Sequence, residues 1–218
     1  MPQSIRQSLT IWLINKIQRF GPRRVRVLGD TYRISENVFN PGRYYTSKFM
    51  AENIDVKATD KVLDMGTGSG IQAIAAARRA LRVVGVDINP EAVHCAKENV
   101  RAAGLEDRVT VMQGDLFSSL GGEDKFDVIL FTPPYFGGTP RTIFEHALMD
   151  PDKALIKKFF INARDYLTRD GHVQMLYSSI AAHERVLQIT AELGWEHSLM
   201  AQTKTWTERF FIYKLWPL

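Results

Sequence analysis

The sequence predicts an α/β fold, a doubly wound and mostly parallel sheet with helices packed on it, preceded by an N-terminal helix and hairpin. Two observations predict this class. Short apolar runs that suit buried strands, including residues 83–86 and 126–131, alternate with segments of helical periodicity. Glycines, carboxylates or prolines follow these runs, and in such a sheet these turns gather at the carboxyl ends of the strands. We therefore expect a ligand site at that edge.

The bulk composition fits a single globular domain. The chain has 218 residues with ordinary apolar and charged fractions, which is enough to bury a full core. No apolar run approaches the ~18 residues that a membrane span requires, so we expect no membrane association. Cys95 is the only cysteine, which argues against a disulfide framework or a cysteine-based zinc site and favours a cytoplasmic location. The histidines show no ligand spacing, and we expect no metal.

Residues 1–37 differ from the rest in charge and pattern, and we expect them to form an accessory segment. An amphipathic helix is predicted over residues 4–20, and alternating polar and apolar residues around residues 28–30 predict a hairpin. A basic cluster precedes Glu36. The cluster consists of Arg6, Lys16, Arg19, Arg23, Arg24, Arg26 and Arg33. It suits RNA, an acidic protein or an anionic small molecule, and a solvated basic face is the plain alternative.

The segment KVLDMGTGSGIQAI, residues 61–74, reads as a strand, a glycine-rich turn and a helix in succession. The glycines at every second position, Gly66, Gly68 and Gly70, remove three β-carbons. A ligand can therefore lie directly against the strand end and the helix N-terminus. The dinucleotide fingerprint G-x-G-x-x-G requires glycine where this sequence has Ile71, which argues against NAD.

A second carboxylate follows the next strand. The apolar run at residues 83–86 ends in Asp87, about 20 residues beyond the glycines, where such folds place a ribose-binding acid. A carboxylate there accepts hydrogen bonds from both ribose hydroxyls. The two strand ends together predict a nucleoside site, and an α/β core with purely structural loops is the alternative.

Together these motifs resemble the class I methyltransferases that depend on S-adenosylmethionine (SAM), whose first motif is an acidic residue followed by G-x-G-x-G. The resemblance covers about residues 38–215. It implies a methyltransferase domain over residues 38–218, with a seven-stranded sheet whose last strand is antiparallel, and SAM as the cofactor. Asp64 is expected to organise the turn or to meet the cofactor's amino group. The implied cofactor-binding residues here are Asp64, Gly66, Gly68, Gly70, Asp87 and Ile88.

Two further segments extend the implied cofactor site. After a predicted strand at residues 109–112, Asp115 matches the acid that meets the adenine amine in this family, and Leu116 matches the residue beside the ring. Their alternative is a turn and a core leucine. Release-factor glutamine methyltransferases (HemK-like) carry a proline-arginine-threonine segment before the core. Pro41, Arg43 and Thr46 resemble it in order with altered spacing, so Arg43 or Thr46 is expected at the cofactor carboxylate.

Aromatic residues accompany that segment and the loop after the fourth strand. We expect them to line the substrate side, with packing against the preceding elements as the alternative. The residues concerned are Phe39, Tyr44, Tyr45 and Phe136. A helix is predicted over residues 46–54, with Thr46 or Ser47 as its cap. Residues 136–150 read as a long loop suited to a substrate lid.

The acceptor loop is predicted at Thr132, Pro133, Pro134 and Tyr135, directly after the run at residues 126–131. Family members that methylate amino or amide groups carry Asn or Asp followed by Pro-Pro-Tyr or Pro-Pro-Phe here. The side-chain oxygen and a carbonyl accept hydrogen bonds from the target NH2, and the ring stacks on the planar group. Threonine at position 132 departs from this pattern, since its hydroxyl is shorter and can donate as well as accept, which argues against the usual grip on a planar amide or adenine. An altered acceptor, such as an aliphatic amine, a ring nitrogen or a hydroxyl on a small metabolite, is one interpretation, and a plain exit from strand to loop is the alternative.

We therefore expect in-line methyl transfer from SAM to a nucleophile held by the Thr132–Tyr135 loop, with positioning as the main source of rate. A small-molecule or peptide-like nitrogen acceptor is slightly favoured over RNA or a release-factor glutamine. Two other functions stay open: an enzyme that cleaves or cyclises SAM without methylating, and a nucleic-acid-binding module that uses the basic N-terminus. The sequence does not indicate an oligomeric state.

Overall fold

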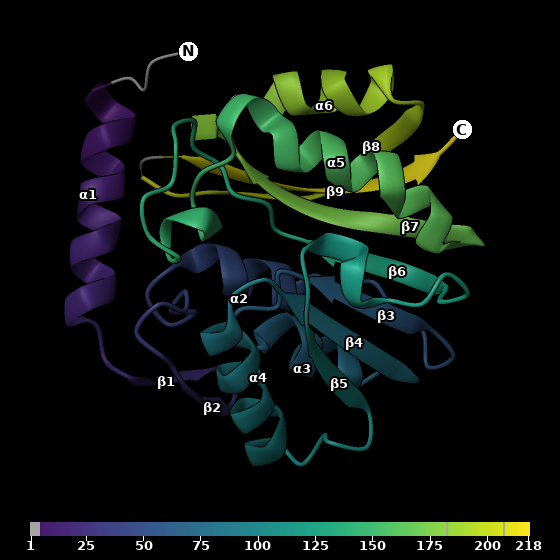
Figure 1. Cartoon of the computed structure of the whole chain (residues 1–218), viewed down its shortest axis with the longest axis horizontal. Coiled ribbons are helices and arrows are strands. Elements are labelled where there is room, and N and C mark those ends of the chain that lie inside the picture. The colour runs from purple at the N-terminus through teal and green to yellow at the C-terminus, as the bar shows by residue number, and fades with distance from the viewer. Residues whose placement is uncertain (1–4, 182, 207) are drawn as a thin grey trace.

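The computed structural model describes residues 5–181, 183–206 and 208–218 (Figure 1). Seven strands form one sheet in the order β5-β4-β3-β6-β7-β9-β8. The strands are β3 Lys61–Met65, β4 Arg82–Asp87, β5 Val109–Gln113, β6 Phe126–Phe131, β7 Leu167–Ser178, β8 Trp195–Lys204 and β9 Arg209–Pro217. The pairs from β5 across to β7 are parallel, and β9 runs antiparallel to both β7 and β8. The predicted seven-stranded, mostly parallel sheet with an antiparallel last strand is confirmed.

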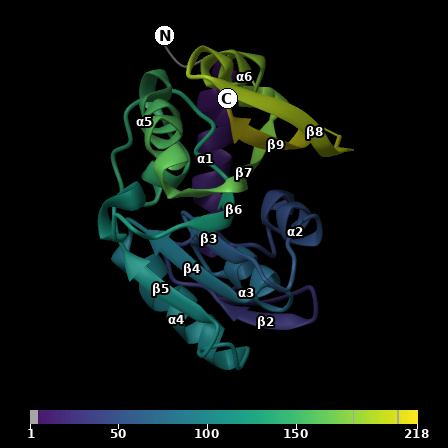
Figure 2. The ribbon, with the colours of Figure 1, turned by 90° about the vertical axis from the view of Figure 1, so that its right-hand side faces the viewer.

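Helices cover both faces of this sheet, as Figures 1 and 2 show. One face packs against α2 (Tyr45–Glu52), α3 (Ile71–Ala77) and α4 (Pro90–Ala102). The other packs against α5 (Ala154–Ala163) and α6 (His183–Glu192). Alternate residues of β6 enter the two cores, Val128 and Leu130 on the first side and Ile129 and Phe131 on the second. Burial on both faces explains why the strands read as continuous apolar runs.

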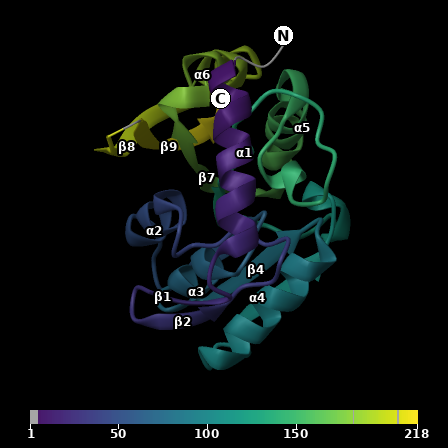
Figure 3. The same cartoon turned by 90° about the vertical axis from the view of Figure 1, so that its left-hand side faces the viewer.

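The N-terminal segment forms α1 (Ile5–Phe20) and a hairpin of β1 (Arg24–Val27) and β2 (Asp30–Arg33), which confirms the predicted helix and hairpin. Helix α1 crosses the carboxyl edge of the sheet (Figure 3). Its Ile11 is buried in a small cluster with residues of the loop after β6. The other buried members of that cluster are Phe136, Phe144, Leu148 and Met149. The accessory helix therefore covers the edge where the predicted site lies.

Several element boundaries differ from the sequence predictions. Helix α2 begins at Tyr45, and its cap residue Tyr44 makes no side-chain capping hydrogen bond, so the prediction that Thr46 or Ser47 caps this helix is wrong. Thr46 lies inside the first turn with its side chain buried. The helix expected over residues 4–20 begins outside the described residues.

Short 3-10 turns interrupt the connections. They are Leu116–Ser119, Glu145–Ala147, Pro151–Lys153, Arg164–Tyr166 and Ser179–Ala181. The loop at residues 136–150 is closed at its base by Phe136, whose N–H donates to Leu148 O at 2.8 Å and whose carbonyl accepts from Asp150 N at 2.8 Å. The base of this loop is therefore fixed by the backbone.

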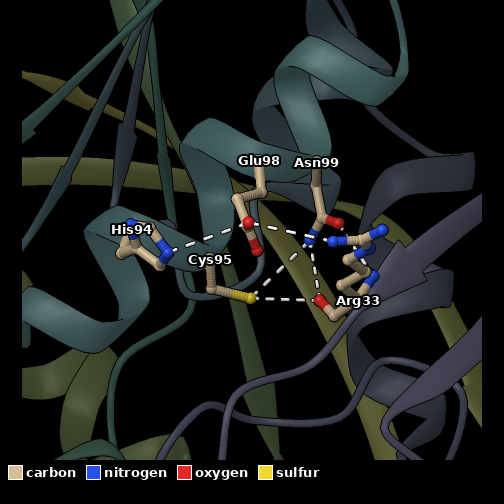
Figure 4. Close-up of polar contacts among 5 residues, drawn as sticks. All are labelled: Arg33, His94, Cys95, Glu98 and Asn99. Carbon is tan, nitrogen blue, oxygen red and sulfur yellow. Dashed lines mark hydrogen bonds and ion pairs between the residues drawn. The ribbon is translucent and has the colours of Figure 1, made fainter.

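Asn99 on α4 joins the hairpin to the glycine-rich turn (Figure 4). Its Oδ1 accepts from Arg33 N at 2.8 Å, and its Nδ2 donates to the carbonyls of Arg33 and Ser69, each at 2.9 Å. Arg33 O also accepts a hydrogen bond from Cys95 Sγ. Asn99 is only 2% exposed. Because its amide satisfies backbone groups of both the hairpin and the turn, we infer that it anchors the accessory hairpin to the site.

Replacing Asn99 with alanine is expected to lower the free energy of unfolding by about 2–4 kcal/mol. The change removes these three hydrogen bonds and a longer one to Cys95 Sγ, and it leaves Arg33 N and the buried Ser69 carbonyl without the Asn99 side chain as partner. Denaturant unfolding measures the loss. His94→Ala, which removes an exposed side chain of the same helix, is the matched control. Equal stabilities of the two variants would contradict the anchoring role.

Candidate active site

The glycine-rich turn between β3 and α3 has the backbone conformation that the sequence predicts. Gly66, Gly68 and Gly70 have φ values of +75°, +55° and +82°, in the left-handed region that favours glycine. The N–H groups of Gly66 and Thr67 donate to Val86 O at 2.8 and 3.0 Å, so the turn folds onto the end of β4. A β-carbon on Gly70 would lie 3.2 Å from Ala96 Cβ, and glycine therefore also lets α3 approach α4.

Asp64 organises this turn from the end of β3. Its Oδ2 accepts from Thr67 Oγ1 at 2.6 Å and from Ala73 N at 3.0 Å. Asp64 is 1% exposed, and no described donor reaches Oδ1. Burial raises the pKa of Asp64 to about 7, the charge of Asp87 adds to the rise, and the two hydrogen bonds oppose it. A buried carboxylate oxygen without a donor fits a ligand that carries a positive charge.

Asp87, at the end of β4, faces the same turn. Its Oδ2 accepts from Gly68 N at 2.9 Å and its Oδ1 from Asn89 N at 2.9 Å. Burial raises the pKa of Asp87, while backbone N–H groups oppose the rise. A carboxylate has about four lone-pair positions, so this group retains capacity for two hydroxyl donors. The next residue, Ile88, is 49% exposed and offers an apolar side chain beside them.

Asp115 and Leu116 follow β5. Asp115 Oδ2 lies 2.6 Å from Lys158 Nζ of α5, in an exposed ion pair. Leu116 has φ of +51°, a conformation that costs a non-glycine residue roughly 1–2 kcal/mol. The sequence did not indicate that a lysine would meet Asp115, because Lys158 lies 43 residues further along the chain and on another helix.

At the end of β6, Thr132 meets a residue that the sequence analysis missed. Gln72 Nε2, from the first turn of α3, donates to Thr132 Oγ1 at 3.1 Å. Gln72 is 8% exposed. The available signal was a polar residue inside the run IQAIAAA, which otherwise reads as a buried helix. Gln72 thus links the glycine-rich turn to the Thr132–Tyr135 loop.

Tyr135 is the packing centre of that loop. Its side chain contacts all three clusters of buried apolar residues, and its ring lies edge-on to Tyr177 with centroids 5.1 Å apart. The hydroxyl is buried, with no hydrogen-bond partner among the described residues. Burial, followed by the charges of Tyr177 and Glu208, raises the pKa of Tyr135 well above its ordinary value. The ring is therefore held firmly, while its hydroxyl is not satisfied by the described part of the protein.

Lys153 secures the same loop from the start of α5. Its Nζ donates to the Tyr135 carbonyl at 2.9 Å and to Tyr177 Oη at 2.8 Å. Burial lowers the pKa of Lys153, and the nearby charge of Asp150 partly offsets this. Lys153 and the preceding Asp152 both have positive φ. This strained turn directs the amine at the loop.

The structure separates the aromatic residues that the sequence analysis grouped on the substrate side. Phe39 stacks on Tyr44 with centroids 4.0 Å apart, and Tyr44 Oη donates to Ile14 O of α1 at 3.0 Å. Phe39 also packs against the cluster that contains Phe136, beneath α1. Tyr45 lies apart from them, 43% exposed, near the rings of Phe49 and Phe210.

Arg43 and Thr46 occupy the start of the same segment. Arg43 is exposed, whereas the Thr46 side chain is buried in α2. Neither Arg43 nor Thr46 is among the donors to Asp64 and Asp87 described above. The place of Arg43 and Thr46 in a cofactor site stays a prediction.

The strand ends therefore bring together a turn of three glycines, two carboxylates suited to a cationic nucleoside, and a Pro-Pro-Tyr loop on the neighbouring strand β6. Fold and site together define a class I methyltransferase. The chain belongs to the methyltransferase small domain family, whose model matches residues 33–207. It is a SAM-dependent enzyme, and SAM is its cofactor.

Relatives that carry methyltransferase names agree with this family. A Methanocaldococcus jannaschii protein, provisionally named a protein N5-glutamine methyltransferase, is 32% identical over 89% of this chain and 99% of its own length. The release factor glutamine methyltransferase of Rhodopirellula baltica is 42% identical over 57% of this chain. The tRNA1(Val) (adenine(37)-N6)-methyltransferase of Porphyromonas gingivalis is 32% identical over 52%. The chain spans 45% and 48% of these last two relatives.

A solved structure shares the fold. The ribosomal protein L11 methylase of Lactobacillus delbrueckii superposes with a TM-score of 0.59 at 21% identity, over 81% of this chain and 80% of its own. In the part of the chain that is described, no helix has the length and apolar character to cross a membrane. Among the same residues no group of His, Cys, Asp and Glu is arranged to hold a metal ion.

The residues present fit SAM. The buried, undonated Oδ1 of Asp64 suits the ammonium group, and the remaining lone pairs of Asp87 suit the ribose hydroxyls. The left-handed glycines leave no side chain between the turn and a ligand.

The affinity for SAM is expected to fall about tenfold between pH 8 and pH 6. Asp64 must be ionised to pair with an ammonium group, and its pKa is raised to about 7. Since the pKa of Asp64 is raised from 3.8 to about 7, the folded protein binds a proton more tightly than the unfolded chain, and the unliganded protein loses stability as the pH rises from 3.8 to about 7. Calorimetric titration at several pH values measures the affinity.

Asp64→Asn is the diagnostic variant for this titration. Titration of the ligand itself is common to both proteins, so the difference between them isolates the carboxyl group. We expect weaker binding at pH 8 and a flatter pH profile in the variant. Parallel profiles for wild type and Asp64→Asn would contradict an ion pair at Asp64.

Proposed function

We propose that this enzyme methylates the side-chain amide nitrogen of a glutamine in a protein. The observation that carries the proposal is the position of Pro133, Pro134 and Tyr135, which leave β6 beside the glycine-rich turn. The names of two relatives, one aligned along nearly its whole length, support a glutamine acceptor. The ring of Tyr135, held by contacts with three apolar clusters, is the flat surface on which a planar amide would stack.

The proposed roles of the residues follow from their places at the edge. Asp64 and Asp87 bind the ammonium group and the ribose, and the turn at Gly66, Gly68 and Gly70 lies beneath the ligand. Ile88 and Leu116 flank the adenine, with Asp115 at its amine. Arg43 or Thr46 contacts the cofactor carboxylate. Phe39, Tyr44, Tyr45 and Phe136 are proposed as the substrate side, with Phe39, Tyr44 and Phe136 acting through the cluster under α1.

The reaction needs orientation more than acid–base chemistry. When bound, SAM supplies an electrophilic methyl group on a positively charged sulfur. The Thr132–Tyr135 loop would hold the acceptor nitrogen toward this methyl group, displacing it from the sulfur, and the nitrogen would release one proton to water. Holding two reactants in line is worth an effective molarity of order 10⁵ M or more.

RNA is the second candidate acceptor. One relative is named as an adenine-N6 methyltransferase of tRNA, and the exocyclic amine of adenine is also a planar NH2 group. Arg23, Arg24 and Arg26 lie at the start of the hairpin and are exposed or nearly so. Such a cluster would bind phosphates with strong dependence on salt.

The test is transfer of labelled methyl from SAM in a cell lysate that is afterwards separated into protein, RNA and metabolite fractions. We expect the label in protein, at a glutamine identified by mass spectrometry. Asp87→Ala serves as the inactive control, and SAM without lysate measures any cleavage of the cofactor alone. Label that depends on the enzyme and appears only in RNA or metabolites would refute a protein acceptor.

Two further proposals concern organisation and location. Residues 1–37 act as an accessory segment of the domain at 38–218, in keeping with the anchoring of the hairpin through Asn99. A single buried cysteine, Cys95, is consistent with a reducing compartment, and we propose the cytoplasm.

A further inference from the structure

The hydrogen bond between Gln72 and Thr132 lies between the two halves of the site. Gln72 is the second residue of α3, just after Gly70, whereas Thr132 is the first residue after β6. The donor is Gln72 Nε2 and the acceptor is Thr132 Oγ1, 3.1 Å apart. A residue in this place can contact both the cofactor side and the acceptor side.

Gln72 and Thr132 each keep one hydrogen-bonding group that their mutual hydrogen bond does not use. A hydroxyl has one donor and two acceptor positions. Because Thr132 Oγ1 accepts from Gln72, its own O–H remains to donate. No described residue donates to Gln72 Oε1, and this atom is not among the buried unpaired atoms. The pair therefore offers one O–H donor and one amide oxygen acceptor, which matches the donor and acceptor of a single asparagine carboxamide.

We propose that Gln72 determines acceptor specificity, acting with Thr132 as a carboxamide divided between two elements. Gln72 Oε1 accepts a hydrogen bond from the N–H of the acceptor, and Thr132 O–H donates to the oxygen or ring nitrogen next to it. The substrate class is then a planar N–H beside a hydrogen-bond acceptor, such as a side-chain amide. An aliphatic amine or an alcohol satisfies only half of this pair. This inference rests on the proposed function, because it takes from it that the acceptor nitrogen belongs to a planar group.

A purely structural role for Gln72 makes different predictions. If its amide served only to satisfy Thr132, substitution would lower stability and leave the kinetic preference between acceptors unchanged. An asparagine at position 132 would then give no benefit in the absence of Gln72. Variants at positions 72 and 132, made singly and together, therefore distinguish a structural role of Gln72 from a role in acceptor specificity.

The test uses Gln72→Leu, Thr132→Asn and the double variant, assayed with a short peptide containing one glutamine and with an RNA oligonucleotide containing one unpaired adenine. We expect Gln72→Leu to lower kcat/KM about 10- to 100-fold, the loss that fits one hydrogen bond to a reacting group. Binding of the demethylated product of SAM should change less than about twofold. The double variant should regain at least about tenfold over Gln72→Leu, because the introduced asparagine carboxamide restores both a donor and an acceptor.

Gln188→Leu on α6 is the matched control, since Gln188 is exposed and lies on a helix that contributes none of the site residues described above. Unfolding free energies of all variants show whether any loss reflects misfolding. Unchanged kcat/KM in Gln72→Leu, or no recovery in the double variant, overturns the inference.

The outcomes also separate this inference from the proposed function. Activity of the wild type on the RNA and not on the peptide refutes the glutamine acceptor, and the variants are then judged by the same criteria on the RNA. Recovery in the double variant on either acceptor supports the role of Gln72. Wild-type transfer to neither probe, with product binding intact, overturns the planar acceptor and the inference together.

Discussion

Replacing Asp87 with alanine is expected to weaken the binding of SAM and of its demethylated product by about 100-fold or more. The carboxylate lies at the end of β4 with capacity for two hydroxyl donors beyond Gly68 N and Asn89 N. Hydrogen bonds to charged groups contribute about 1.5–3 kcal/mol each, and loss of two corresponds to roughly 10²–10⁴-fold in affinity. The substitution also frees Gly68 N, which loosens the turn beneath the ligand.

Calorimetric titration with the demethylated product measures this effect without turnover. Asp107→Ala is the matched control, because Asp107 is an exposed aspartate in the loop that leads into β5. The variant's unfolding curve shows whether it is folded. A folded Asp87→Ala protein that binds the demethylated product with wild-type affinity would contradict the claim that Asp87 binds the ribose.

Tyr135→Ala is expected to have the largest effect on stability, about 3–5 kcal/mol, the usual cost of deleting a packed aromatic ring. The ring contacts all three apolar clusters at once. Turnover should fall by at least about 100-fold, since displacement of the acceptor loop by about 1 Å suffices for that. Denaturant unfolding and steady-state kinetics measure the two effects, with Trp206→Ala as the control, because Trp206 is an exposed aromatic residue outside the proposed site.

Tyr135→Phe separates the ring from the hydroxyl. The hydroxyl is buried without a partner among the described residues, so its removal should leave stability unchanged or raise it by about 1 kcal/mol. A loss of kcat in this variant would assign the hydroxyl to the acceptor. A clear loss of stability would show instead that the hydroxyl has a partner in the folded protein.

The features that could be predicted from sequence are local ones. Gly66, Gly68 and Gly70 adopt the left-handed backbone that their spacing suggests, and Asp64 and Asp87 follow apolar runs that become adjacent parallel strands. The seven-stranded sheet and its antiparallel last strand came from the resemblance to a known family, and the topology confirms them. The local features need only the chain's periodicity and the geometry of a parallel sheet.

Features that depend on contacts between distant segments could not be predicted. The pattern around Gln72 indicates only a buried helix. Its hydrogen bond to Thr132 could not be predicted, because Thr132 lies 60 residues away in the sequence. The lysine at Asp115 and the lysine at the Tyr135 carbonyl come from α5 and the turn before it. The apolar face predicted for α1 was wrong, because Leu9, Trp12, Leu13 and Phe20 are exposed. The helix packs on the loop cluster through Ile11 instead. The predicted cap of α2 was wrong because the helix starts at Tyr45, one residue before Thr46.

The most direct test of the account is a calorimetric titration of the folded wild-type protein with the demethylated product of SAM. We predict a single binding site on each chain, with affinity that falls by about 100-fold or more in Asp87→Ala and is unaffected in Asp107→Ala. Absence of binding heat at a pair of well-separated temperatures, with both the product and SAM itself, would contradict the claim that the carboxyl edge of this sheet binds the cofactor.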